Sequence, residues 1–373
     1  MFNDPWPARR NTLRTFDLLD FYRYVGALWV AVAHYTVYFP LGRDFRAPFF
    51  EAMQPLMGFF FTLSGFVIMH VYDGRITSFA KYGDYLRKRL ARIYPIFLAT
   101  FAISYTYAIY TKNHSDMFAS SAILPNLLLI HAWGTTHMLT FDYPSWSVSA
   151  EIFVYLLFPV FLFMINRLGA FALALPFVLG LAVIAAFSVF GLGNWMDATF
   201  NGGCLRAAPS FVAGMVVYRL ATRDLVGFRA PAWFAHSMAV ATIVLMLAGV
   251  PGPVMLVYMA ALVFVMAAAE PEQPSVLSRP FARRLANASY GFYLLHIPVA
   301  EIVLRSLVRR LGWPVTATYA LAPVAILATT ALAIVSFQYF ENPLRRYLGA
   351  STWRVPTFLD ISNNIKQPVK DVS

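Results

Sequence analysis

Ten long apolar runs constrain this chain more than any other feature of its sequence. Each run has roughly the 17–25 residues that a helix needs to cross a hydrocarbon layer about 30 Å thick. Only 13% of the residues are charged, about half the usual share in soluble domains. This composition excludes a soluble globule, a coiled coil and a disordered chain, and it predicts an all-α, polytopic transmembrane helix bundle. The runs lie near 24–41, 52–72, 93–111, 146–166, 168–190, 204–220, 234–250, 253–269, 289–308 and 318–340.

An eleventh segment, 117–133, is apolar but contains Pro125, Asn126 and His131. Cytoplasmic loops are enriched in Lys and Arg, so the basic residues can decide whether it crosses. If it does not cross, 22 basic residues fall inside and 7 outside; if it crosses, the split is 14 to 15. We therefore expect ten spanning helices, with 117–133 re-entrant or lying at the outer face. Both termini are then cytoplasmic.

The remaining composition limits the class of protein further. We expect one transmembrane domain over 1–347 and a polar cytoplasmic tail over 348–373, in a bacterial-type inner membrane. Arg9, Arg10 and Arg14 precede the first run without a small-residue cleavage site, so no removable signal peptide is predicted. The net charge of +11 is explained by cytoplasmic loops and not by nucleic-acid binding. The single cysteine, Cys204, excludes an internal disulfide framework.

Arg23 and His34 are ionisable residues of the first apolar run, and such residues are costly in a membrane helix. They are 11 residues apart, which places them on one helix face and about 16 Å apart along the axis. This spacing suits a long ligand with a charged head at Arg23 and a reactive end at His34. A snorkelling arginine and a hydrogen-bonded core histidine would explain the same pair.

Two further segments have the composition of a donor site. Ser64 and Gly65 lie in a run of small and aromatic residues, where small side chains permit either close helix packing or a role for the hydroxyl. Arg89 and Arg92 share a helix face at a spacing of three, and guanidinium groups bind phosphate in a bidentate manner. A topology signal is the alternative explanation of these arginines.

Polar groups also interrupt three later runs. Glu151 could orient or deprotonate a histidine, bind a substrate hydroxyl, or pair with an arginine, for which Arg206 is the plausible partner. Trp146 suits a membrane interface. His296 lies in an otherwise apolar segment, where a structural histidine is more common than a catalytic one. Glu341 precedes Asn342-Pro343, as expected for simple helix termination before a proline.

Taken in order, these segments resemble the acyltransferase-3 family of integral membrane acyltransferases over about residues 15–347. The departures are small: Phe21 and Tyr22 replace a common Gly-Leu pair, and Ala150 replaces a common valine. The segments that carry the resemblance are Arg23-x10-His34, Phe60-Phe61-Thr62-Leu63-Ser64-Gly65-Phe66, Arg89-Leu90-Ala91-Arg92-Ile93-Tyr94-Pro95, Trp146-Ser147-Val148-Ser149-Ala150-Glu151 and Tyr290 to His296.

The resemblance implies transfer of an acyl group, usually acetyl, from cytoplasmic acyl-CoA to a hydroxyl of a glycan or glycolipid. Surface polysaccharide, lipopolysaccharide and oligosaccharides are typical acceptors, and a minority of relatives acylate macrolides. Spacing and resemblance together predict a site without metal. In it, the Ser64–Gly65 turn admits the thioester, and His34 acts as general base or first takes the acyl group. The expected catalytic residues are His34, Ser64 and Glu151, the acyl-CoA ligands are Arg23, Arg89 and Arg92, and the substrate-binding residues are Trp146, Ser149, Arg206 and His296.

Two other classes fit the residues taken without the resemblance. A proton-coupled transporter or flippase would also place His, Arg and Glu inside a bundle, although no internal repeat is evident. A polytopic glycosyltransferase using a lipid-linked sugar usually has an acidic pair in an early outer loop. Here Asp44 and Glu51 are seven residues apart.

Overall fold

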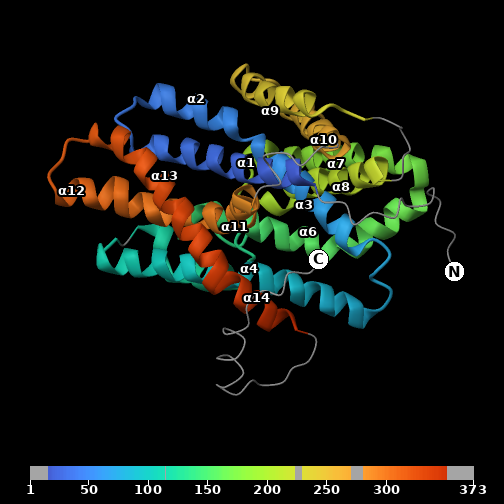
Figure 1. Cartoon of the computed structure of the whole chain (residues 1–373), viewed down its shortest axis with the longest axis horizontal. Coiled ribbons are helices and arrows are strands. Elements are labelled where there is room, and N and C mark those ends of the chain that lie inside the picture. The colour runs from blue at the N-terminus through green and yellow to red at the C-terminus, as the bar shows by residue number, and fades with distance from the viewer. Residues whose placement is uncertain (1–15, 114, 223–228, 270–279, 351–373) are drawn as a thin grey trace.

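The computed structural model describes residues 16–113, 115–222, 229–269 and 280–350, and within these ranges it contains helices and no strand. The all-α prediction is therefore confirmed for the described part of the chain. Most of the predicted tail, 348–373, lies outside it, as do Arg9, Arg10 and Arg14. The helices run side by side along the long axis of the molecule (Figure 1).

Every predicted apolar run coincides with a helix. The α-helices are α1 (Asp17–Tyr35), α2 (Arg43–Met53), α3 (Leu56–Tyr72), α4 (Phe79–Tyr110), α5 (Ile123–Leu127), α6 (Trp146–Leu168), α7 (Leu175–Val189), α8 (Gly203–Thr222), α9 (Ala232–Leu247), α10 (Gly252–Ala268), α11 (Pro280–Ala300), α12 (Val308–Arg310), α13 (Ala317–Ser336) and α14 (Asn342–Gly349). Two π-helical segments, Glu301–Leu307 and Phe337–Glu341, follow α11 and α13.

Five helical stretches of the described chain are long and apolar enough to cross a membrane. Four of them each join two α-helices: α2 with α3, α6 with α7, α11 with α12, and α13 with α14. The apolar helices α9 and α10 are shorter, with 16 and 17 residues. The structure thus supports a helical membrane protein, and the count of ten spanning helices stays a prediction. The five stretches are Asp44–Tyr72, Phe79–Tyr110, Tyr143–Val189, Pro280–Arg310 and Ala317–Gly349.

The eleventh segment does not form a spanning helix. It consists of two short 3-10 turns and the five-residue helix α5. The Asn126 side chain donates to the carbonyl of Ala122 and to Thr140 Oγ1, both at 2.8 Å, so it ties this segment to its own loop. The prediction that 117–133 fails to cross agrees with this structure.

Hydrogen bonds join the ends of α3, α6 and α8 at one side of the bundle, and the starts of α3 and α8 at the other. Arg219, at the end of α8, donates to Asp73 after α3 and to Asn166 near the end of α6. At the opposite end of these helices, Arg206 near the start of α8 donates to the Gln54 carbonyl before α3 at 2.6 Å. Helices α3, α6 and α8 therefore end together at one face of the bundle, as the predicted alternation of loops requires.

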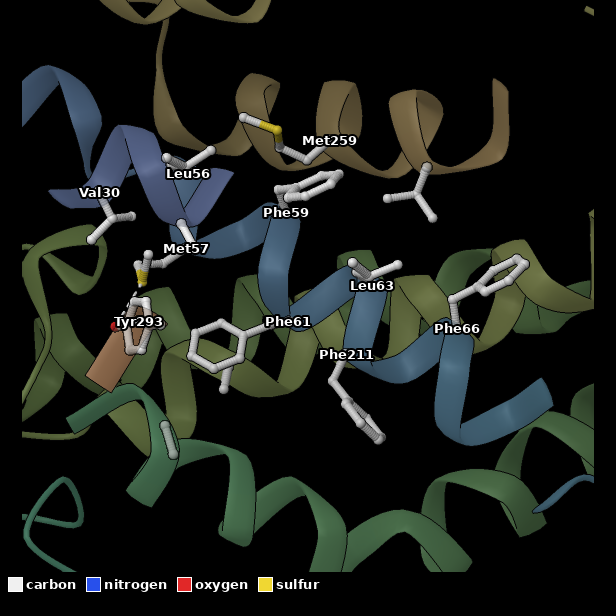
Figure 2. Close-up of a cluster of buried hydrophobic side chains, with 14 of the residues drawn as sticks. Val30, Leu56, Met57, Phe59, Phe61, Leu63, Phe66, Phe211, Met259 and Tyr293 are labelled. Atoms are coloured by element: carbon white, nitrogen blue, oxygen red, sulfur yellow. Dashed lines mark hydrogen bonds between the residues drawn. The ribbon is translucent and has the colours of Figure 1, made fainter. Parts of the chain in front are cut away.

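Helices α3 and α8 touch backbone to backbone. A Cβ atom added at Gly65 would lie 1.9 Å from the Phe211 carbonyl oxygen, and one at Gly214 would lie 1.8 Å from the Thr62 carbonyl oxygen. Figure 2 shows α3 within the surrounding core, where Phe61 and Phe211 are labelled. Gly65 thus serves close packing, which was one of the two predicted roles of this segment. The expectation that it admits a thioester is wrong, because Gly65 faces α8.

Candidate active site

A cavity of about 260 Å³ lies between α1, α3, α4, α6 and α11. These helices come from distant parts of the chain, and each contributes polar side chains to a largely apolar wall. The polar lining residues are Arg23, Ser64, Arg89, Arg92, Ser147, Glu151, Tyr155, Ser289, Tyr290 and Tyr293. Five of the predicted site residues are therefore brought together: the three arginines, Ser64 and Glu151.

Arg23 is held against α11. Its Nε donates to Ser289 Oγ and its guanidinium to the Ala286 carbonyl, both at 2.9 Å. It also forms an ion pair with Asp20 at 3.1 Å. These contacts leave the arginine at the cavity wall with a defined orientation. The α1 face that carries it packs along α11, as the predicted common face of Arg23 and His34 requires.

Arg89 and Arg92 of α4 complete a group of three cations. Arg89 lies over the Tyr72 ring and donates to its hydroxyl at 3.3 Å, while its buried Nε has no hydrogen-bond partner in the described part of the chain. No hydrogen bond or ion pair joins Arg92 to another residue of the described chain, although Glu341 attracts it electrostatically. This end of the cavity therefore keeps unused hydrogen-bond donors and excess positive charge, which suits a phosphate ligand.

Ser64, Glu151 and Tyr155 form a hydrogen-bonded triad in the cavity wall. Glu151 Oε1 accepts from Ser64 Oγ at 2.6 Å and from the Tyr155 hydroxyl. Since a hydroxyl carries one proton, the Ser64 proton is directed to the carboxylate. In this structure the Ser64 hydroxyl donates to Glu151, and its expected role as an oxyanion donor stays a prediction.

Tyr293 closes the end of the cavity remote from the arginines. Its hydroxyl donates to the Pro144 carbonyl at 3.0 Å and lies 2.8 Å from Ser147 Oγ. Tyr293 and Met57 face one another across this end (Figure 2). The other face of the Tyr293 ring contacts the His296 ring, with 5.8 Å between centroids.

His34 lies beyond this closure and does not line the cavity. Its Nδ1 is 2.8 Å from His296 Nε2, and the two rings lie edge to edge in nearly parallel planes, with 5.0 Å between their centroids. Glu151, which was expected to orient His34, bonds instead to Ser64 and Tyr155. The sequence placed His34 and Arg23 on one face correctly, but the partner of His34 is His296.

All four residues expected to bind substrate, His296 among them, lie outside the cavity lining. The Ser149 hydroxyl is fully buried, donating to the Leu129 carbonyl and accepting from the Ala132 amide. Trp146 is buried, and the Arg206 guanidinium lies over its ring at 5.2 Å. The expected pairing of Arg206 with Glu151 is wrong, since Arg206 bonds to Gln54 and to the Ala198 carbonyl.

Three tyrosines of the cavity lining were not predicted as site residues, because the functional roles of their motifs were assigned to Glu151 and His296. Tyr155 lies one helical turn after Glu151, and Tyr290 and Tyr293 lie within the segment that ends at His296.

Glu341 is buried and packs so closely on α11 that a Cβ at Gly291 would lie 2.5 Å from its carboxylate. The carboxylate of Glu341 therefore has a packing role, and the expected helix termination before Pro343 is wrong, because the helical stretch continues to Gly349.

An aromatic and ionic cluster surrounds the accessible side of His34. The His34 ring, which is partly exposed, lies 5.2 Å from both Phe50 and Tyr143. Nearby, Tyr38 donates to Glu301 Oε1 at 2.7 Å, and Glu301 forms an ion pair with Arg305 at 3.2 Å. Glu301 and Arg305 belong to a π-helical segment, a geometry often found at functional sites.

The loop before α6 holds two buried titratable groups near this cluster. Burial raises the pKa of Asp142 to about 8, and the Thr100 hydroxyl offsets this only in part. Burial lowers the pKa of His131 to about 4, and its Nε2 lies 3.2 Å from Ser145 Oγ. Both groups therefore favour their neutral forms near pH 7.

Comparisons with known proteins agree with the arrangement of these segments. Residues 16–338 match the model of the family Acyl_transf_3, described as an acyltransferase domain. The chain is 26% identical over 326 residues to acyltransferase MdmB of Streptomyces mycarofaciens, which covers 78% of this chain and 80% of that protein. It is 35% identical over 99 residues to protein 2 in picA locus of Rhizobium radiobacter, covering 25% and 46%. No solved structure matches. The chain belongs to the acyltransferase-3 family and is an acyltransferase enzyme.

Proposed function

We propose that this enzyme transfers an acyl group, expected to be acetyl, from cytoplasmic acyl-CoA to a hydroxyl of a glycan or glycolipid. One observation carries the proposal: a cavity is lined by Arg23, Arg89 and Arg92 and also by Tyr293, whose ring contacts His296, the hydrogen-bond partner of His34. Phosphate-binding groups and an imidazole thus occupy the two ends of one path through the bundle.

The cationic end suits the donor. Coenzyme A carries several phosphates, and charge-assisted hydrogen bonds from arginine are the strong kind. Arg92 and the Nε of Arg89 have no hydrogen-bond partner among the described residues, so both can serve a ligand. The rise of α1 separates Arg23 from His34 by about 16 Å, a span suited to an extended pantetheine arm.

The transfer itself needs a base at the acceptor hydroxyl. In the proposed step, the His34 imidazole takes the hydroxyl proton while the oxygen attacks the thioester carbonyl. The C–O bond forms, the C–S bond breaks, and His34 returns the proton to the departing sulfur. An ester and free coenzyme A result. Neither His34 nor His296 lines the cavity, whereas Tyr293 does and contacts His296, so the proposed step requires the Tyr293 side chain to move aside when the donor is bound. A relay in which His34 first takes the acyl group would use the same path.

The acceptor is expected at the accessible side of His34. Aromatic faces such as Phe50 and Tyr143 suit stacking of a sugar ring, and Glu301 can accept hydrogen bonds from hydroxyls. A macrolide-type small molecule would present hydroxyls to the same groups and is the alternative acceptor class. The proposal also includes ten spanning helices in a bacterial inner membrane, with both termini cytoplasmic.

The direct test measures coenzyme A release from acetyl-CoA in the presence of an acceptor extract. We expect the His34→Ala variant to lose at least about 100-fold in turnover, the lower range for a general base. His236→Ala is the matched control, since exposed His236 bonds to Tyr22 outside the cavity. Full activity of His34→Ala, with His236→Ala also active, would overturn the assignment of His34.

A further inference from the structure

The two hydrogen-bonded histidines of α1 and α11 differ in exposure. His34 is partly exposed, whereas His296 is completely buried. Since His296 does not line the cavity either, no face of it is free to touch a substrate. Whatever His296 contributes to the reaction must therefore act through its neighbours.

The hydrogen bonds of His296 determine which of its nitrogens carries the proton. Its Nδ1 lies 2.5 Å from the backbone carbonyl oxygen of Tyr293. A carbonyl oxygen can only accept, so Nδ1 of His296 must be the donor. In a neutral imidazole the other nitrogen, Nε2, then carries the lone pair. Among the described residues, no carboxylate contacts either histidine to stabilise a charged ring.

The tautomer of His296 determines which nitrogen of His34 carries the proton. His34 Nδ1 is 2.8 Å from the lone-pair nitrogen of His296, so Nδ1 of His34 must donate. The Nε2 of His34 is then left unprotonated and able to accept a proton. A neutral imidazole with a free Nε2 is the form that a general base requires.

The backbone of His296 is itself fixed. The buried Tyr35 hydroxyl donates to the His296 carbonyl at 3.2 Å. Tyr35 belongs to α1, one residue after His34, so the same two helices hold both the ring and the backbone of the pair. The planes of the two rings are inclined by only 16°, so the hydrogen bond between their nitrogens lies close to both ring planes.

We propose that His296 is a positioning residue that holds His34 in the Nδ1–H tautomer, with its Nε2 directed as base to the acceptor. This inference rests on the proposed function of His34. It replaces the expectation that His296 binds substrate. The hydrogen bonds form one chain with a single direction. His34 Nδ1 donates to His296 Nε2, and His296 Nδ1 donates to the Tyr293 carbonyl.

The test compares three substitutions by their kcat, KM and pH dependence. His296→Gln keeps an acceptor toward His34 and a donor toward the Tyr293 carbonyl, so it should retain most of kcat. His296→Ala removes the hydrogen-bond chain. His296→Lys offers only a donor toward His34, which enforces the tautomer of His34 with an unprotonated Nδ1 and a protonated Nε2. We expect the Ala and Lys variants to lose on the order of 10²- to 10⁴-fold in kcat, with little change in the KM for acyl-CoA or in the KM for the acceptor. The acidic limb of the kcat profile should shift in His296→Ala, since its His34 no longer has a partner for Nδ1–H.

Two outcomes overturn the proposal. One is wild-type kcat in His296→Ala; the other is a loss confined to the acceptor KM, which a substrate contact would produce. Neither affects the assignment of His34, which His34→Ala tests separately. If a variant does not fold, ¹⁵N-histidine spectra of the wild-type protein in nanodiscs test the tautomers directly, with His34→Gln providing the resonance assignment. A protonated Nε2 on His34 in these spectra would contradict the proposal.

Discussion

Individual residues show both the strength and the limit of prediction from sequence. The spacing of Arg23 and His34 identified a common face because helix geometry alone determines it. The hydrogen-bond partner of His34 lies 262 positions away in α11, and no local pattern encodes that contact. The same reason explains why Arg206 was paired with Glu151 and not with Gln54.

The three arginines give the first prediction at this scale. Arg89→Gln and Arg92→Gln should each raise the Kd for coenzyme A by about 10- to 100-fold, the range for a hydrogen bond to a charged group. Arg87→Gln is the control. Arg87 lies two residues before Arg89 in α4, but it pairs with Asp84 and does not line the cavity. Titration calorimetry measures all three. Equal effects at positions 87, 89 and 92 would indicate a general charge effect and contradict a phosphate site.

Asp142 gives a prediction about pH. Its pKa in the folded protein is about 8, above the ordinary 3.8, so folding takes up a proton between these values. The free energy of unfolding should therefore fall as the pH rises from about 4 to about 8. Asp142→Asn removes this loss, so its Tm should exceed that of the wild type at pH 8 and approach it at pH 4. Exposed Asp116, in the same loop, is the control as Asp116→Asn. A Tm difference that does not change with pH would refute the effect.

Helices were the most predictable elements, because an apolar run of sufficient length has few alternatives in a membrane. Their irregularities were not predictable in the same way. The π-helical segment Glu301–Leu307 follows α11 directly, and nothing in its composition marks the change. The close contact of α3 and α8 was foreseen only as a possibility, because a glycine does not reveal which helix it faces.

That contact yields a prediction at the scale of elements. Gly65→Ala and Gly214→Ala each place a methyl group on a carbonyl oxygen of the facing helix, so the two backbones must separate. We expect each to lower the free energy of unfolding by about 1–3 kcal/mol. Gly180→Ala in α7 is the control, since its added Cβ meets nothing within 4 Å. Thermal unfolding in detergent measures the three variants. Stability of Gly65→Ala equal to that of Gly180→Ala would show that α3 and α8 do not touch as described.

At the scale of the whole molecule, the bundle has two chemically different ends. The arginines and the Arg219–Asp73 pair lie toward one end, while Glu301, Arg305 and the loop before α6 lie toward the other. The distribution of basic residues predicted that the ends differ, because orientation depends on loop charge. It could not predict that His34 lies outside the cavity and contacts His296, since that depends on how α11 packs.

The central claim is that donor and acceptor reach the site from opposite ends of the bundle. The most direct measurement reconstitutes the protein in one orientation in liposomes and supplies radiolabelled acetyl-CoA to one face and acceptor to the other. We predict labelled acceptor only when acetyl-CoA is on the face of Arg89 and Arg92, with no transfer by His34→Ala. Equal transfer with acetyl-CoA on either face would contradict the account.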